Sequence, residues 1–159
     1  MRTREYLDSG ERYVEVKTRR GRVTCKERIA RQGLDAEASG FVAERLAEAG
    51  LTTDVRELHP VLTTTYRRTT YVLPGGAARL TVDTDLVWAL PARDRVTAGR
   101  AVIVETKGAA RPSAADRTLW ALGRRPVAVS KFATGLAALK PDLPHHRWHR
   151  LLTSSLFAH

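Results

Sequence analysis

The stretch ERYVEVKTRRGRVTCKERIA, residues 11–30, decides the fold. Apolar and polar side chains alternate through residues 11–18 and again through 22–29, which is the period of a half-buried β-strand. Gly21 stands between the two runs, and glycine is favoured in the tight turns that join antiparallel strands. The stretch therefore predicts a β-hairpin with one apolar and one charged face.

The rest of the chain repeats this extended pattern and adds short helices. We expect further strands at residues 61–73, 78–88, 101–107 and 126–129, and helices at 35–49, 113–122 and 130–139. Asp35 is placed to cap the first helix and Gly50 to end it, while Ser113 and Asp116 form a capping box for the second. Strands joined by hairpins dominate, so we predict an α+β fold built on an antiparallel β-barrel or strongly curled sheet.

Charge limits the class of partner. The 159 residues include 27 Lys and Arg against 17 Asp and Glu, which gives a net charge of +10 and a pI near 10.6. This excess predicts an anionic partner: a nucleic acid, a phosphate-rich ligand or an acidic membrane surface. Cys25 is the single cysteine, which excludes an intramolecular disulfide. No apolar run approaches the roughly 18 residues of a membrane span, and no signal peptide is evident, so we expect a cytoplasmic protein without a membrane span.

The charged side chains share one face of each expected strand. Alternation gives the apolar face Val14, Val16, Val23, Cys25, Ile29, Leu80, Val82, Leu86, Val102 and Val104. It gives the opposite face Glu15, Lys17, Arg22, Lys26, Arg28, Arg79, Asp83, Asp85, Glu105 and Lys107, and it puts Arg68 on the Tyr66 side of its strand. An ordinary sheet with a solvated polar face also alternates in this way.

Cations on all five of these strands favour a more specific interpretation. The acids stand close to bases, as Glu15 does to Lys17 and Glu105 does to Lys107. In a closed barrel whose apolar face packs outward against helices, these groups would line a central passage. Converging cations would hold a polyanion there, and the carboxylates would hold a divalent metal. A basic surface for nucleic acid is the alternative.

Six motifs, in order, resemble those of one known family. They are YVEVK at residues 13–17, KER at 26–28, YRRT at 66–69, RLTVD at 79–83, VETK at 104–107 and SKF at 130–132. Together they resemble a VTC domain, a relative of the CYTH or triphosphate-tunnel metalloenzymes, over roughly residues 2 to 140. The resemblance implies an antiparallel tunnel barrel with flanking helices at residues 1–143, followed by a tail at 144–159.

The resemblance also implies an activity. VTC domains bind a nucleoside triphosphate or polyphosphate and, with manganese or magnesium, transfer the terminal phosphoryl group onto a polyphosphate chain. It assigns catalysis to Lys17, Lys26, Arg68, Arg79 and Lys131. It assigns substrate binding to Arg2, Arg4, Lys17, Lys26, Arg68, Arg79, Lys107 and Lys131. It assigns the metal to Glu105 and Glu15, with Asp83 as a further metal or network residue.

The chain departs from the family pattern at its start. Family members carry further strands ahead of the Arg-x-Arg segment, whereas here Met1 falls almost directly on Arg2 and Arg4. We therefore expect an incomplete barrel that lacks its first strands. Open sheet edges would then favour weak stability, aggregation or a dimer.

Two other functions stay open. One is triphosphate hydrolysis or cyclisation of the CYTH type, whose Glu-x-Glu-x-Lys signature is not seen, and the other is non-catalytic binding of polyphosphate or nucleic acid. The sequence has no P-loop and no recognisable nucleic-acid-binding motif, so we expect no nucleic acid partner. His145, His146 and His149 lack the accompanying carboxylate or cysteine of a metal site, and we expect a solvated tail there.

Overall fold

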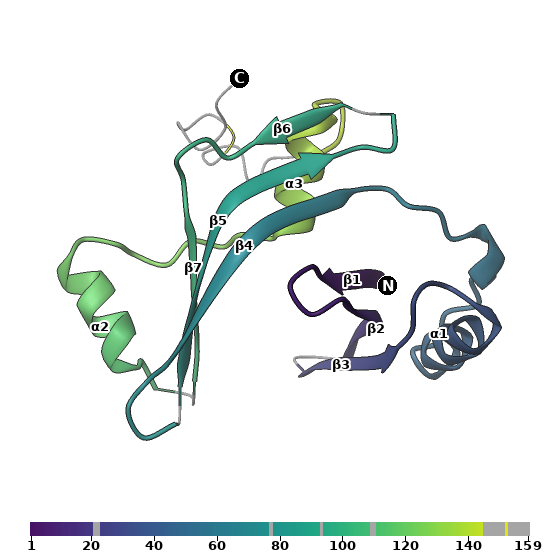
Figure 1. Cartoon of the computed structure of the whole chain (residues 1–159), viewed down its shortest axis with the longest axis horizontal. Helices are drawn as coiled ribbons and strands as arrows, with labels where there is room; N and C mark the ends of the chain where they lie inside the picture. Colours follow the sequence, from purple (N-terminus) through teal and green to yellow (C-terminus); the bar gives the residue numbers. More distant parts are fainter. Residues whose placement is uncertain (21–22, 77, 93, 109–110, 145–151, 153–159) are drawn as a thin grey trace. The chain divides into compact units, whose positions relative to one another are not determined.

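The computed structural model describes residues 1–20, 23–76, 78–92, 94–108, 111–144 and 152. The chain divides into two compact units, Met1–His59 and Pro60–His159, each with its own antiparallel sheet and its own hydrophobic core (Figure 1). The described residues contain three α-helices, so the predicted α+β class is confirmed. The tunnel domain expected over 1–143, with a tail from 144, stays a prediction, since most of that tail lies outside the described residues.

The first unit is a three-stranded sheet with one helix. Strands β1 (Arg2–Tyr6), β2 (Glu11–Arg20) and β3 (Val23–Ala30) pair in the order β1-β2-β3, as the hairpin prediction requires. Helix α1 (Ala36–Glu48) and the 3-10 turn η1 (Val55–Glu57) follow. Asp35 caps α1 by accepting a hydrogen bond from the Ala38 amide, and Gly50, with φ of 76°, lies beyond its end.

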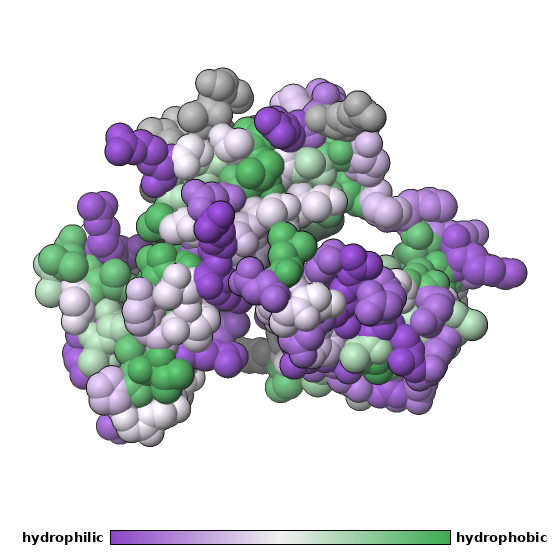
Figure 2. Space-filling model, viewed as in Figure 1, coloured by the Kyte–Doolittle hydropathy of each residue, from purple (hydrophilic) through white to green (hydrophobic). Residues whose placement is uncertain are grey.

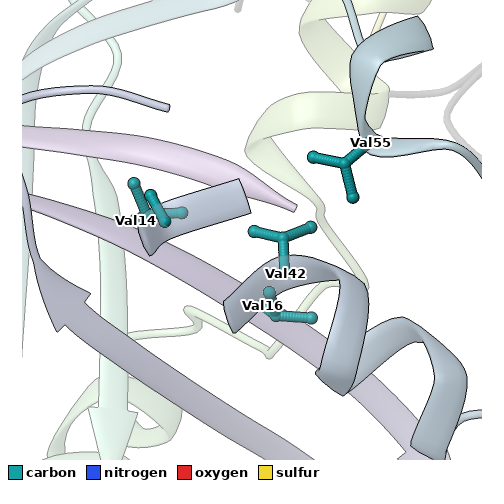
Figure 3. Close-up of a cluster of buried hydrophobic side chains, with 5 residues drawn as sticks. Val14, Val16, Val42 and Val55 are labelled. Carbon is teal, nitrogen blue, oxygen red and sulfur yellow. The ribbon is translucent and has the colours of Figure 1, made fainter. Parts of the chain in front are cut away.

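The core of this unit lies between the sheet and α1. Val14 and Val16 of β2 meet Val42 of α1 and Val55 of η1, and Ala38 completes the cluster (Figure 3). All five side chains are buried. Because residues alternate along β2, burying Val14 and Val16 under α1 turns Glu15 and Lys17 to the opposite face. The predicted split of this strand into an apolar and a charged face is therefore confirmed.

The second unit is built around β5. Its elements are β4 (Thr63–Val72), β5 (Arg79–Ala89), β6 (Arg95–Thr97), β7 (Ile103–Lys107), α2 (Ala114–Ala121) and α3 (Lys131–Leu139). Strand β5 pairs antiparallel with β4, β6 and β7, and β4 and β5 run as two long curved strands in Figure 1. The strand expected at 126–129 is wrong: these residues form neither strand nor helix, and Pro126 has no N–H to donate to a ladder.

A β-bulge in β5 corrects the predicted faces of that strand. Thr65 pairs with Val87, but Arg67 pairs with Thr84, so β5 carries one extra residue at this point. Asp85 lies in the bulge with φ of 52°. An extra residue reverses the alternation beyond it, so buried Leu86 shares a face with buried Asp83. The prediction that Leu86 lies on the opposite face from Asp83 is therefore wrong.

Helix α3 packs on the face that the bulge creates. Leu86 and Trp88 of β5 form the core of this unit with Val96 and Ala98, and the Trp88 indole N–H donates to the Lys131 carbonyl at 2.8 Å. Gly135 lies so close to the indole ring that a Cβ atom there would overlap it. The contact fixes the start of α3, and with it Lys131, against the sheet.

The strands of the described residues do not close a barrel. They form a three-stranded and a four-stranded sheet, and none of the described pairings joins β3 to β4. The predicted barrel is confirmed only as far as antiparallel sheets in an α+β fold. Dimer formation through open edges stays a prediction.

The contact between Gly135 and Trp88 can be tested with two helical glycines. Gly135→Ala should lower the free energy of unfolding by about 1–3 kcal/mol, the usual cost of overpacking. Gly40, in α1, has open space around it, so Gly40→Ala should raise the free energy by up to about 1 kcal/mol through helix propensity. Urea unfolding of both variants measures the difference. Equal behaviour of the two variants would contradict this account of α3 docking.

Candidate functional site

The charged face of the first sheet brings together residues from all three of its strands. In the register of the sheet, Arg2 and Arg28 lie on either side of Glu15, and Lys17 lies opposite Lys26. Arg4 lies one row further along β1, opposite Tyr13. We call Arg2, Arg4, Glu15, Lys17 and Lys26 the first basic face. The predicted substrate-binding residues of this unit therefore share one side of one sheet.

Glu15 is the centre of the first basic face. Its side chain is 1% exposed, yet it is bound by the side chains of Arg2, Arg4 and Lys26, with Nε of Arg4 at 3.6 Å and Nζ of Lys26 at 2.8 Å from Oε1. Burial raises the pKa of Glu15, but hydrogen bonds from Lys26 and Arg2 outweigh it and hold the pKa below its usual value. The carboxylate therefore stays ionised and keeps three cations around it.

The second sheet has an equivalent face. Asp83 lies between Arg68 of β4 and Ile103 of β7, Thr81 lies opposite Glu105, and Arg79 lies opposite Lys107. Lys131 joins them from the first turn of α3. We call Arg68, Arg79, Asp83, Glu105, Lys107 and Lys131 the second basic face. All of the residues predicted for the site in this part of the chain belong to it.

Asp83 has the role in this face that Glu15 has in the first. Its side chain is fully buried and accepts two hydrogen bonds from Arg68, at 2.6 Å from Nε and 2.8 Å from Nη2. Nζ of Lys131 lies 2.7 Å from Oδ2. Burial raises the pKa of Asp83, but the hydrogen bonds from Arg68 and Lys131 outweigh burial and hold the pKa below its usual value. The hydrogen bonds to Asp83 in turn raise the pKa of Arg68.

Tyr66 adds an aromatic contact to the same pair of cations. The Arg68 guanidinium lies 5.2 Å and the Lys131 ammonium 5.5 Å from the centre of its ring, both within cation–π range. From the sequence, Tyr66 was only a motif residue. The sequence signal for this contact was position: Tyr66 precedes Arg68 by two residues and therefore lies on the same face of the strand.

The remaining predicted residues are more exposed. Lys17 and Arg79 are exposed on their faces, and Lys107 lies 3.3 Å from Glu105, whose side chain is 43% exposed. From the sequence, Asp83 was a further metal or network residue, without the central place that the structure gives it. The sequence signal for this central place was the position of Asp83, which follows Arg79 by four residues on one face of the strand. Cations stand on both elements that neighbour this strand.

The two predicted metal ligands differ in their surroundings. The carboxylate of Glu15 is already bound by three cations, whereas the half-exposed carboxylate of Glu105 has one ion pair. Among the residues that the structure describes, there is no group of three or more His, Cys, Asp or Glu side chains that could hold a metal. His145, His146 and His149 lie outside the described residues.

The molecular surface outside these faces is mixed. Figure 2 shows hydrophilic residues over much of the visible side, with hydrophobic residues exposed over α2 and near the end of β4. Val72 of β4 and Leu122, which follows α2, are exposed apolar residues. No helix among the described residues is long and apolar enough to cross a membrane. The two basic faces therefore remain the best-defined candidate sites.

Comparison with known protein families gives a match over most of the chain. The family model described as VTC domain matches residues 1–140 of the 159-residue chain, which spans both basic faces. No curated protein matches the chain. VTC domains are associated with polyphosphate polymerase activity, are typically metal-dependent and imply phosphate substrates.

The role of Asp83 predicts a specific loss of stability. Asp83→Asn removes the charge that binds Arg68 and Lys131, so the free energy of unfolding at pH 7 should fall by about 1.5–3 kcal/mol, the range for hydrogen bonds to charged groups. Because the folded-state pKa is lowered, this contribution is complete above the unfolded pKa of about 4 and is lost as the pH falls below it.

Denaturant unfolding between pH 7 and pH 3 measures both effects. The wild-type chain should lose stability on acidification more steeply than Asp83→Asn, which has one fewer carboxylate to protonate. Identical pH profiles for the two proteins would show that Asp83 is not stabilised by its cations.

Proposed function

The chain belongs to the VTC domain family, and on that premise we propose that its basic faces bind nucleoside triphosphate and polyphosphate and support metal-dependent transfer of a phosphoryl group onto a polyphosphate chain. The observation that carries the proposal is the arrangement of cations in each unit. A buried carboxylate holds Arg and Lys side chains in fixed positions on one side of a sheet. The matched family spans both arrangements.

The cations keep donors for a ligand after binding the carboxylate. Lys26 is 44% and Arg2 54% exposed at the side chain, although both contact Glu15. A guanidinium has five N–H donors and an ammonium three, so one carboxylate does not saturate them. Phosphate oxygens accept such charge-assisted hydrogen bonds, and Arg and Lys are the residues that most often bind them. Each face is thus a set of cationic side chains that are already positioned to bind phosphate oxygens.

Phosphoryl transfer suits such a site. The reaction requires little covalent help from the protein; it requires in-line positioning and positive charge around the transferred group. Arg68 is fixed by two hydrogen bonds and Lys131 by the docking of α3, so both are preorganised before substrate binds. A terminal phosphate of the growing chain serves as the acceptor, which makes a side-chain nucleophile unnecessary.

Glu105 fits a divalent metal better than Glu15 does. Magnesium is commonly bound through one or two carboxylates together with water and substrate phosphates, and manganese prefers similar oxygen ligands. Glu105 is half exposed on the second basic face, where such a ligand set is accessible; the Glu15 carboxylate is enclosed by three cations. Bound there, manganese or magnesium would neutralise charge on the phosphates.

Binding of inorganic phosphate chains tests the proposal directly. The chain should bind polyphosphate more tightly than duplex DNA at equal phosphate concentration, because fixed clusters of donors suit a narrow flexible chain. Lys26→Gln and Lys131→Gln should each weaken polyphosphate binding about tenfold or more, since each removes a charged hydrogen-bond donor. Isothermal titration calorimetry measures both affinities. In each variant the buried carboxylate keeps its arginine partner, so the fold should survive.

The matched control is Lys140→Gln, which removes the same charge from an exposed position at the end of α3. Its affinity should equal that of the wild type. Tighter binding to DNA, with equal effects of all three substitutions and a steep salt dependence, would show a general basic surface instead. Incubation with ATP and manganese then separates polymer synthesis, which yields long chains, from hydrolysis, which yields free phosphate.

We expect Glu105 to contribute to metal-dependent turnover of ATP and not to the thermal stability of the fold. Glu105→Gln should leave the melting temperature nearly unchanged, because exposed ion pairs such as that with Lys107 contribute little. The same substitution should remove manganese-dependent turnover of ATP. Melting curves and product analysis on one preparation measure both. A loss of turnover that follows unfolding would identify Glu105 as a structural residue.

A further inference from the structure

The first basic face ends in a pair of tyrosines. Tyr6 and Tyr13 form an edge-to-face pair with ring centres 6.0 Å apart. Each ring also carries an arginine: Arg4 lies 5.7 Å from the Tyr6 ring centre, and Arg28 lies 4.2 Å from that of Tyr13. Tyr6 is 39% exposed, and Tyr13 is half-buried. Aromatic rings and stacked guanidinium groups are the side chains on which nucleobases stack.

A hollow of about 560 Å³ lies beside Tyr13 within the same unit. In the register of the sheet, Tyr13 lies opposite Ala30, and both residues line the hollow. Gln32, just beyond β3, also lines the hollow and has both a hydrogen-bond donor and acceptors. The volume falls within the usual range of pockets for small ligands.

The hollow differs in charge from the basic face beside it. The lining residue Arg31 is paired with Asp35 and Glu37, and Glu11 accepts a hydrogen bond from the Tyr13 hydroxyl at 3.1 Å. The hollow therefore has carboxylates and neutralised cations, which disfavour phosphate. It suits an uncharged planar group with hydrogen-bonding edges.

We propose that this hollow binds the nucleobase of a nucleoside triphosphate whose phosphates lie on the first basic face. The inference rests on the proposed function, because it takes phosphate binding by Arg2, Lys17 and Lys26 as given. Rows of side chains on one face of a strand are about 6.5 Å apart, so the Tyr13 row and the row of Lys17 and Lys26 are separated by about 13 Å. Base and phosphates thus have separate places along one strand.

The arrangement favours a single nucleotide over a single-stranded RNA. One hollow lies at one end of the sheet face, bordered by carboxylates, while an RNA platform requires several aromatic rings in series with cations on both sides. Within the first basic face, the described cations extend from the tyrosines in one direction, over Glu15 to Lys26.

Comparison of ATP with tripolyphosphate, which has the same number of phosphates and no base, tests the inference. Calorimetry without divalent metal should show ATP binding tighter by on the order of tenfold, as one stacked base provides. Tyr13→Leu removes the aromatic ring, and Ala30→Phe fills the hollow. Both should abolish the advantage of ATP while the affinity for tripolyphosphate stays unchanged.

Tyr71→Leu is the matched control, because Tyr71 is exposed on β4, in the other unit, and should leave the ratio of affinities as in the wild type. Tripolyphosphate binding by the Tyr13 and Ala30 variants also shows that they are folded. Equal wild-type affinities for ATP and tripolyphosphate would overturn the inference and leave the proposed function standing. Failure to bind either ligand would overturn both. An oligoribonucleotide that displaces ATP and binds more tightly would assign the tyrosines to RNA.

Discussion

Two buried carboxylates set the positions of the cations on both sheet faces. An ionised carboxylate away from water is costly unless cations and hydrogen bonds compensate it. Glu15 meets that requirement with side chains from β1 and β3, and Asp83 meets it with side chains from β4 and α3. The carboxylates therefore tie neighbouring elements together as well as orienting the groups that face solvent. Removing either one would leave several cations close together without a compensating charge.

The same arrangement keeps the cations ready for an anionic ligand. Arg and Lys side chains lose considerable rotamer freedom when they bind, and side chains already held by a carboxylate have lost much of it on folding. The lowered pKa values of Glu15 and Asp83 keep the carboxylates ionised at neutral pH. A phosphate chain bound as proposed would add its oxygens to the outer side of a preformed cluster. Preorganisation of this kind is the largest contribution that a protein makes to phosphoryl transfer.

The sequence alone predicted most of the local structure and part of the site. Alternation located β2, β3 and β5 to within about two residues, and the caps at Asp35 and Ser113 located two helices. Most members of both basic faces followed from the same alternation, whereas Arg2, Arg4 and Lys131 followed only from the resemblance to VTC domains. Whether the strands close into a barrel could not be predicted from the sequence, because pairing between distant strands depends on long-range contacts that no local pattern encodes. The central place of Asp83 was missed for a similar reason: Lys131 reaches it from a helix 48 positions later in the sequence.

The bulge at Asp85 has a consequence for how this protein can change in evolution. It allows β5 to present a charged half and an apolar half on the same side, so that the helix seated on the apolar half delivers Lys131 to the charged half. Without the bulge, regular alternation over the five positions from Asp83 to Trp88 would place the two side chains on opposite sides of β5. Most substitutions along β5 change one side chain each, whereas a change at Asp85 that straightened the strand at unchanged length would separate the charged half from the apolar half. The backbone geometry of one position therefore holds both halves together.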